Sequence, residues 1–268
     1  METRRKQPKK VKIVTKPYLT GTPVDKHFLT SALKLLGGMI GAAFLFLIAG
    51  AVLLVENTVV RIALNSLAML VIYALFFISG MSTGTAAVNL GEMLHTRREN
   101  GRNVSAAEQS LCYHPLKGFL VGLTGAIPFF VCAVLLALTA QLHLTGLSPL
   151  PSWVSGLEGH EEITDALAYY AAVPGMTLED IVRMPVRMAL MPLVGMIGSE
   201  NAAGLLLLER VSPVLMLIPG LCYGTGYTRG VSARTQVHTS IAANNRKRAR
   251  REKKQQQARA ARKPEQLN

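Results

Sequence analysis

Four long apolar stretches constrain the fold of this 268-residue chain more than any other feature of its sequence. A helix needs about 20 mainly apolar residues to cross the roughly 30 Å hydrocarbon core of a bilayer. Charged residues make up only 17% of the chain, whereas soluble domains carry about 25%. We therefore expect an all-α fold, a polytopic integral membrane helical bundle with four transmembrane helices, over residues 28–55, 59–81, 116–142 and 205–227.

The fourth stretch is the least regular, because Glu209 and Arg210 interrupt it. Ser212 followed by Pro213 is typical of a helix start, since proline fits the first helical position. A shorter span that begins at Ser212 and ends near Tyr227 is therefore an alternative.

A fifth apolar stretch, residues 184–198, is harder to interpret. It has only 15 residues and contains Pro185 and Pro192, which suits an interfacial or re-entrant helix. The pattern Thr177-Leu-Glu-Asp180 before it resembles a capping box and predicts a helix that begins near Leu178. A fifth transmembrane helix here stays open as an alternative.

Lysine and arginine gather at both ends of the chain. Residues 1–27 contain eight and residues 229–268 contain twelve, whereas residues 143–209 contain two against eight acidic residues. Positively charged loops stay on the cytoplasmic side of a membrane. We therefore expect a cell-membrane protein with both termini in the cytoplasm, which requires an even number of spans. Five spans would put the basic C-terminus outside, the main argument against that alternative.

This topology divides the chain into three parts. They are a basic cytoplasmic N-terminal tail, a transmembrane domain with a cytoplasmic hairpin and an extracytoplasmic loop, and a basic cytoplasmic C-terminal tail; the ranges are 1–27, 28–227 (hairpin 84–115, loop 143–209) and 228–268. In the hairpin, residues 84–95 extend the second helix inward. Ser105 and Glu108 then match a capping box and predict a short second helix that ends before Pro115.

Pairs of glycines four residues apart predict how the helices pack. Helices in lipid associate by close packing through small residues. We expect these pairs to pack within one chain, with an oligomer interface as the alternative: Gly37 and Gly41, Gly118 and Gly122, Gly220 and Gly224.

The motifs that resemble catalytic or binding sites lie in the wrong context. Gly80-Met-Ser82-Thr-Gly84 has the spacing of a hydrolase nucleophile elbow but follows an apolar helix, not a strand, so we interpret it as a flexible helix exit. Glu92 and His95 share a helical face, yet the chain has no second Glu-x-x-His pair for a di-iron site. The glycines of residues 224–230 lack the spacing of a dinucleotide site, and we expect them to let the chain leave the bilayer.

Metal and disulfide chemistry are also weakly supported. His143 and His160-Glu-Glu162 lack any spacing that would fix a metal site, and Cys112, Cys132 and Cys222 contain no Cys-x-x-Cys pair. We expect free thiols, no cofactor, no metal site and no catalytic residue.

The C-terminal tail has no apolar face, so only its charge can attach it to a partner. We expect it to contact anionic lipid headgroups; nucleic acid, the ribosome and a protein partner are the alternatives. The residues that would make this contact are Arg246, Lys247, Arg248, Arg250, Arg251, Lys253 and Lys254.

No motif identifies a reaction, so the expected function is structural. We expect a multipass membrane protein without catalysis, acting as a scaffold or as a subunit of a membrane complex with other membrane proteins. The alternative is a transporter or channel component whose interrupted helices place Glu209 and Arg210 at a substrate site. A membrane hydrolase that uses Ser82 is a third hypothesis.

Overall fold

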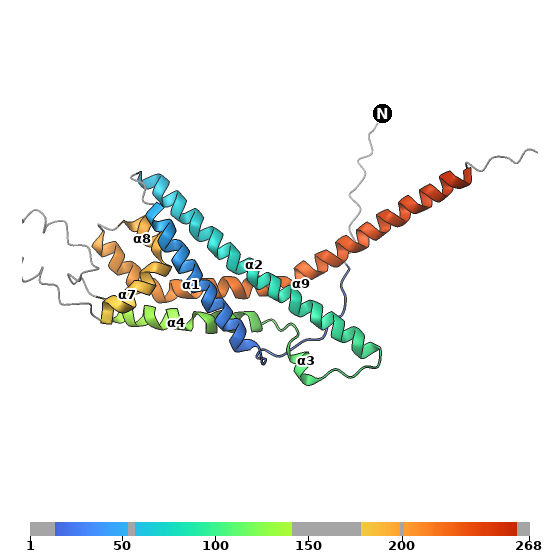
Figure 1. The fold of residues 1–268 in the computed structure, drawn as a ribbon, viewed down its shortest axis with the longest axis horizontal. Helices are drawn as coiled ribbons and strands as arrows, with labels where there is room; N and C mark the ends of the chain where they lie inside the picture. Colours follow the sequence, from blue (N-terminus) through green and yellow to red (C-terminus); the bar gives the residue numbers. More distant parts are fainter. Residues whose placement is uncertain (1–13, 53–56, 141–177, 199–200, 262–268) are drawn as a thin grey trace, which may run out of the picture.

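The computed structural model describes residues 14–52, 57–140, 178–198 and 201–261, and these residues form helices joined by loops without any strand (Figure 1). The bounds of the helices are α1 Phe28–Val52, α2 Thr58–Glu99, α3 Ala106–Ser110, α4 Lys117–Thr139, α7 Leu178–Ala189, α8 Met191–Ile197 and α9 Ala202–Ala261.

Four helices, α1, α2, α4 and α9, are long and apolar enough to cross a membrane, which confirms the expected number of apolar helices. The fifth apolar stretch is divided between the end of α7 and α8, which have 12 and 7 residues and meet at Leu190. At 1.5 Å per residue, neither reaches the roughly 30 Å of a bilayer core. Thr177, the first residue of the capping pattern, lies outside the described residues.

Three predictions about helix ends are wrong, and the first concerns the start of α9. Helix α9 does not begin at Ser212; it begins at Ala202 and continues through Pro213. Proline removes one backbone donor and leaves the carbonyl four residues earlier without its helical partner. The Ser212 hydroxyl donates to that carbonyl, on Glu209, at 2.7 Å, so the helix continues without a break.

Glycines that we interpreted as helix exits lie inside helices. Helix α2 passes through residues 80–84 and ends at Glu99, and α9 passes through residues 224–230 and ends at Ala261. These glycines instead let two helix backbones approach. A Cβ atom on Gly80 would overlap the carbonyl oxygen of Tyr223, and one on Gly226 would overlap that of Phe77.

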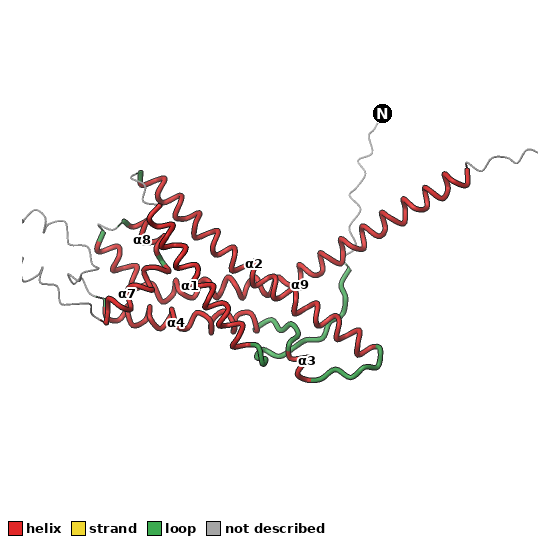
Figure 2. The backbone as a smooth tube through the Cα atoms, viewed as in Figure 1, coloured by secondary structure: helices red, strands yellow, loops and turns green. Residues whose placement is uncertain are grey.

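Helix α9 forms the axis of the bundle and packs along both α2 and α4 (Figure 1). Its contact with α4 is also built on glycine, because a Cβ atom on Gly220 would lie 2.5 Å from the carbonyl oxygen of Gly122. Helix α1 packs on α4, while α7 and α8 close one end of the bundle. The loops on either side of α3 and the segment before α1 gather at the other end (Figure 2).

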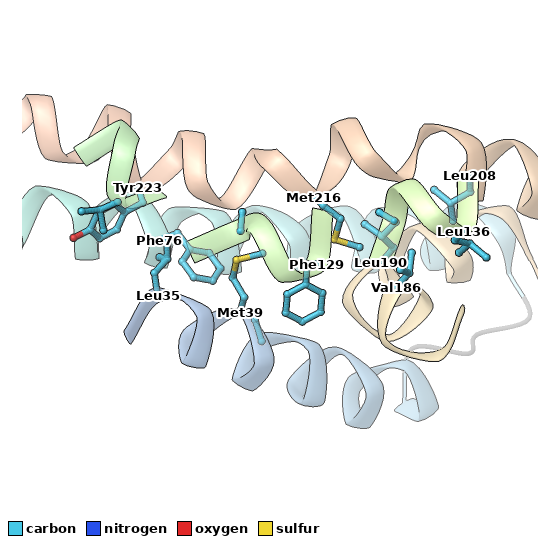
Figure 3. Packing of buried hydrophobic residues seen from close by; sticks show 14 of the residues in the cluster. Leu35, Met39, Phe76, Phe129, Leu136, Val186, Leu190, Leu208, Met216 and Tyr223 are labelled. Atoms are coloured by element: carbon cyan, nitrogen blue, oxygen red, sulfur yellow. The ribbon is translucent and has the colours of Figure 1, made fainter. Parts of the chain in front are cut away.

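A large apolar cluster fills the space between these helices (Figure 3). Met39 of α1, Phe129 of α4, Val186 of α7 and Met216 of α9 meet there, each less than 9% exposed. Other large apolar side chains point outward, as Leu138 does at 80% exposure. Contiguous exposed apolar surface of this kind is typical of helices that face lipid.

Candidate functional site

The most buried charges lie where α7 meets the start of α9. Arg183 of α7 is 1% exposed and Glu209 of α9 is 3% exposed. Arg183 Nε and Arg187 Nε both donate to Glu209 Oε1, at 2.9 and 2.8 Å. Arg183 also pairs with Glu179 and Asp180 on its own helix. We call these five residues the buried ion network.

Helix geometry brings the network together. Glu179, Arg183 and Arg187 are four residues apart and therefore lie on one face of α7. Glu209 meets that face from α9, so the ion pairs connect two helices whose sequences lie 22 to 26 positions apart. Because buried ions lose their hydration, such pairs contribute more to the position of a helix than to net stability.

The two residues proposed for a transport site have different surroundings. Glu209 is buried in the ion network, whereas its neighbour Arg210 is exposed on the outer face of α9. Successive helical residues are about 100° apart, so adjacent side chains face different partners. The structure therefore does not bring Glu209 and Arg210 to one site.

A small recess lies in the apolar core between α1, α2 and α9. Its volume is about 20 Å³, and its lining includes Met39, Phe46, Phe76 and Met216. That volume is about enough for one water molecule.

A second polar cluster connects α2 to α9 at the other end of the bundle. Glu92 of α2 is 8% exposed, and Arg234 Nε and Nη2 donate to its Oε2 atom at 3.0 and 2.9 Å. Arg234 Nη2 also donates to Asn89 Oδ1 at 2.6 Å, and His238 Nε2 lies 2.7 Å from Glu92 Oε1. We call these four residues the α2–α9 clamp. The clamp gives both oxygens of the buried Glu92 carboxylate a partner on α9.

The N-terminal segment, residues 14–27, crosses this end of the bundle and touches three of its parts. The Val14 N–H donates to Thr239 Oγ1 of α9 at 3.2 Å, and the Leu19 N–H donates to the Gly91 carbonyl of α2 at 3.2 Å. The Gly21 N–H donates to the Tyr113 carbonyl at 2.9 Å. The segment therefore places the start of the described chain against the C-terminal half of α9.

Aromatic and ionic contacts support the same region. The Tyr113 ring stacks on that of Tyr227, with centroids 5.3 Å apart, and meets Tyr18 edge to face. Lys117, at the start of α4, pairs with Asp25 of the N-terminal segment. These contacts link α4, α9 and the N-terminal segment.

Beyond the clamp, α9 leaves the bundle as an isolated helix (Figure 1). Every residue from 244 to 258 is exposed, and we call this part of α9 the basic arm. It contains all seven residues expected to contact an anionic surface: Arg246, Lys247, Arg248, Arg250, Arg251, Lys253 and Lys254. Arg248 Nε donates to Glu252 Oε1 at 3.0 Å.

The glycine pairs have different surroundings. Gly118, Gly122, Gly220 and Gly224 lie in the contact between α4 and α9, where an added Cβ atom would overlap the facing helix. An added Cβ atom on Gly37 or Gly41 would meet nothing within 4 Å. These two glycines lie on the exposed face of α1.

The remaining chemical motifs do not gather into a site in the described residues. Ser82 is exposed in the middle of α2, and His95 pairs with Glu99 at 3.6 Å. No group of three metal-ligating side chains occurs among the residues that the structure describes. His143 and residues 160–162 lie outside those residues, as does most of the loop at 143–209.

All three cysteines are free thiols in the structure. Cys112 is fully buried beneath the N-terminal segment, and this burial raises the pKa of its thiol. Nearby, hydrogen bonds from the backbone and hydroxyl of Ser105 hold the pKa of the Glu108 carboxyl below its usual range. The two residues form the expected capping box at the start of α3.

Sequence reasoning missed the arginines that pair with Glu209 and Glu92. Arg183 and Arg187 were counted as loop charges, although Glu179, Arg183 and Arg187 at four-residue spacing indicate one charged helix face. Arg234 and His238 were counted as part of the tail. Arg234 and His238 are four residues apart, and this spacing likewise indicates that they share one face of a helix.

Comparisons with protein-family models, with curated proteins and with solved structures find no match for this chain.

Proposed function

We propose that this chain is a multipass membrane protein without catalysis that acts as a scaffold or subunit of a membrane complex and presents the basic arm to a partner in the cytoplasm. The continuity of α9 carries the proposal. This helix has 60 residues, about 90 Å at 1.5 Å per residue, and includes both an apolar part buried in the bundle and the exposed basic arm.

Three connections support the arm as a fixed feature of the molecule. The ion network holds the start of α9, glycine contacts hold its middle, and the α2–α9 clamp holds it just before the arm. Because a continuous helix transmits its direction along its length, the arm keeps a defined orientation relative to the bundle.

Two observations support the cytoplasmic location of both termini. The described residues contain four helices able to span, an even number, and the hydrogen bond between Val14 and Thr239 puts the N-terminal segment beside the C-terminal half of α9. Both basic tails then lie on one side, as the positive-inside rule expects.

Cysteine accessibility in cells tests this topology. In a chain without native cysteines, Gln256→Cys reports the arm and Asn201→Cys, before α9, reports the opposite end. A membrane-impermeant maleimide should label the Asn201 variant in intact cells and the Gln256 variant only after permeabilisation. The reverse pattern contradicts the proposal.

Photo-crosslinking tests the scaffold role. A photo-reactive amino acid replaces Gln256 on the arm or, as a matched control, Leu70 on the exposed face of α2. The Gln256 position should give discrete adducts with a macromolecular partner, and the Leu70 position should give lipid adducts. If both positions give lipid adducts alone, the proposed role is wrong.

A transporter or channel component is the second candidate, favoured by the two short helices α7 and α8 and by the contact of α7 with the buried Glu209. Broken helices of this kind build substrate sites in transporters. Flux in proteoliposomes that disappears with Glu209→Gln and persists with Arg210→Gln would support this function. Equal flux in both variants would remove Glu209 from the mechanism.

A further inference from the structure

The basic arm carries more positive charge than its own helix can neutralise. Residues 246–254 contain seven Lys or Arg and one acidic residue, Glu252, which pairs with Arg248. Arg246 and Arg250, four residues apart, are neighbours on the helix surface, as are Arg250 and Lys254. Like charges at this spacing repel one another along the helix surface. A polyanionic partner would remove this repulsion.

The N-terminal segment reaches the base of the arm. The Val14 N–H donates to Thr239 Oγ1, seven residues or about 10 Å along α9 before Arg246. This hydrogen bond joins residues 225 positions apart in the sequence.

The position of the arm argues against the lipid surface as its partner. Tyr227 lies against Gly118, at the start of α4, where the apolar part of the bundle ends. From Tyr227, α9 extends about 29 Å to Arg246 and about 40 Å to Lys254. The screening length at physiological salt is about 8 Å. If Tyr227 marks the edge of the hydrocarbon core, a helix tilted by about 45° still holds Arg246 roughly 20 Å beyond that edge, more than twice the screening length.

The side chains of the arm identify the chemistry of its partner. Helices that bind proteins in grooves do so through apolar residues on one face, whereas residues 244–258 contain only charged and amide side chains and alanine. Arginine forks match phosphate oxygens in pairs, and the basic side chains of the arm cover more than half of the helix circumference. Arginine-rich segments are a recurring class of RNA-binding element.

We propose that the basic arm binds the phosphate backbone of structured RNA. This inference rests on the proposed function in one respect, the location of the arm in the cytoplasm. Base-specific recognition is not part of the proposal, since the arm has no aromatic side chain on which a base could stack.

Fluorescence anisotropy tests RNA binding with the full-length protein in nanodiscs of zwitterionic lipid. The probe is a labelled 20-base-pair RNA hairpin, titrated at several salt concentrations. The arm variant carries Arg246→Gln, Arg250→Gln and Arg251→Gln, and leaves the Arg248–Glu252 pair intact. The matched control removes three charges from the protein's own hairpin, residues 84–115, which lies at the same end of the bundle as the arm. Its substitutions are Arg97→Gln, Arg98→Gln and Arg102→Gln.

The arm variant should weaken RNA binding at least about tenfold and should lower the salt slope by about 3, one unit for each lost phosphate contact. The control should change both quantities little. Equal losses in the two variants would overturn the proposal, because general positive charge would then explain the binding. Equal affinity for a DNA duplex of the same length would overturn the assignment to RNA.

A second experiment tests whether the basic arm binds anionic lipid headgroups instead of RNA. An environment-sensitive fluorophore on Gln256→Cys should show no change between zwitterionic and anionic nanodiscs, and anionic lipid should not compete with RNA. A blue shift together with loss of RNA binding would assign the arm to headgroups and overturn the proposal. Because this assay is independent of membrane orientation, an RNA-binding arm that proved extracytoplasmic would refute the proposed function and not the RNA-binding chemistry.

Discussion

Replacement of Glu209 by glutamine should destabilise the bundle through the charges that it leaves behind. The side chain keeps its size and one amide oxygen, so the loss is mainly electrostatic. Glu209 Oε1 accepts hydrogen bonds from Arg183 and Arg187, and Arg183 is 1% exposed. Without the carboxylate, two guanidinium groups face a neutral amide in a poorly hydrated site.

The expected loss can be worked out from these contacts. Removal of one partner from a buried ion pair costs about 3–5 kcal/mol. Arg183 keeps its pairs with Glu179 and Asp180, and glutamine still accepts one hydrogen bond. We therefore expect the lower end of that range, about 3 kcal/mol. For a chain of this size, this loss corresponds to a fall in melting temperature of about 6–12 °C.

Thermal unfolding in detergent measures this effect, followed by a fluorophore that reacts with thiols as they become exposed. Cys112 is fully buried in the folded state and is a suitable reporter. Arg210→Gln is the matched control, since that side chain is exposed and its loss should change stability by less than about 0.5 kcal/mol. A Glu209→Gln protein as stable as the control, or more stable than wild type, would refute the reasoning, because desolvation of the network would then outweigh its pairing.

Two further predictions follow from close contacts. Gly122→Ala should lower the melting temperature by several degrees, about 1–3 kcal/mol, because its Cβ atom would overlap the Gly220 backbone, whereas Gly37→Ala should leave it unchanged. Gly21→Val should displace the N-terminal segment from Cys112; the thiol pKa, raised by burial, then falls towards its ordinary value and more thiolate forms at neutral pH. Alkylation of Cys112 should accelerate about tenfold, equivalent to about 1.4 kcal/mol of lost local protection. Mass spectrometry measures this rate in the variant and in the wild-type protein, which retains Gly21.

The parts of the fold that were predictable depend on signals within one segment. The four apolar helices follow from length and hydropathy, and the capping pair Ser105 and Glu108 specifies its own short helix. None of these features needs knowledge of what packs against the segment.

Two of the wrong predictions concern glycines whose role depends on a partner helix, and the third concerns a proline whose effect is offset within its own helix. A glycine in an apolar stretch can end a helix or permit close packing, and Gly80 does the second because α9 lies against it. Pro213 suggested a helix start, but the hydroxyl of Ser212 satisfies the carbonyl that the proline frees. Within lipid, such internal satisfaction keeps a helix continuous where the same residues would end it in water.

The partners of the charged residues in the candidate sites were equally unpredictable from one segment of sequence. The sequence marks Glu209 and Arg210 as unusual within an apolar stretch, but their rotation about α9 decides that one enters the ion network and the other faces outward. Glu92 and Arg234 are 142 positions apart, so nothing in either segment indicates their pairing.

Continuity of α9 links these long-range contacts to the arm. Glu209 and Arg234 are 25 residues apart, about 38 Å along one helix, and each is held by ion pairs to a different neighbour, α7 or α2. Two such attachments on one rigid element determine both its position along the bundle and its rotation about its own axis. The basic arm begins only ten residues beyond Arg234, so its orientation follows from contacts that lie wholly inside the bundle. Charge in the tail supplies the attraction to a partner, and the buried ion pairs determine where that charge is presented.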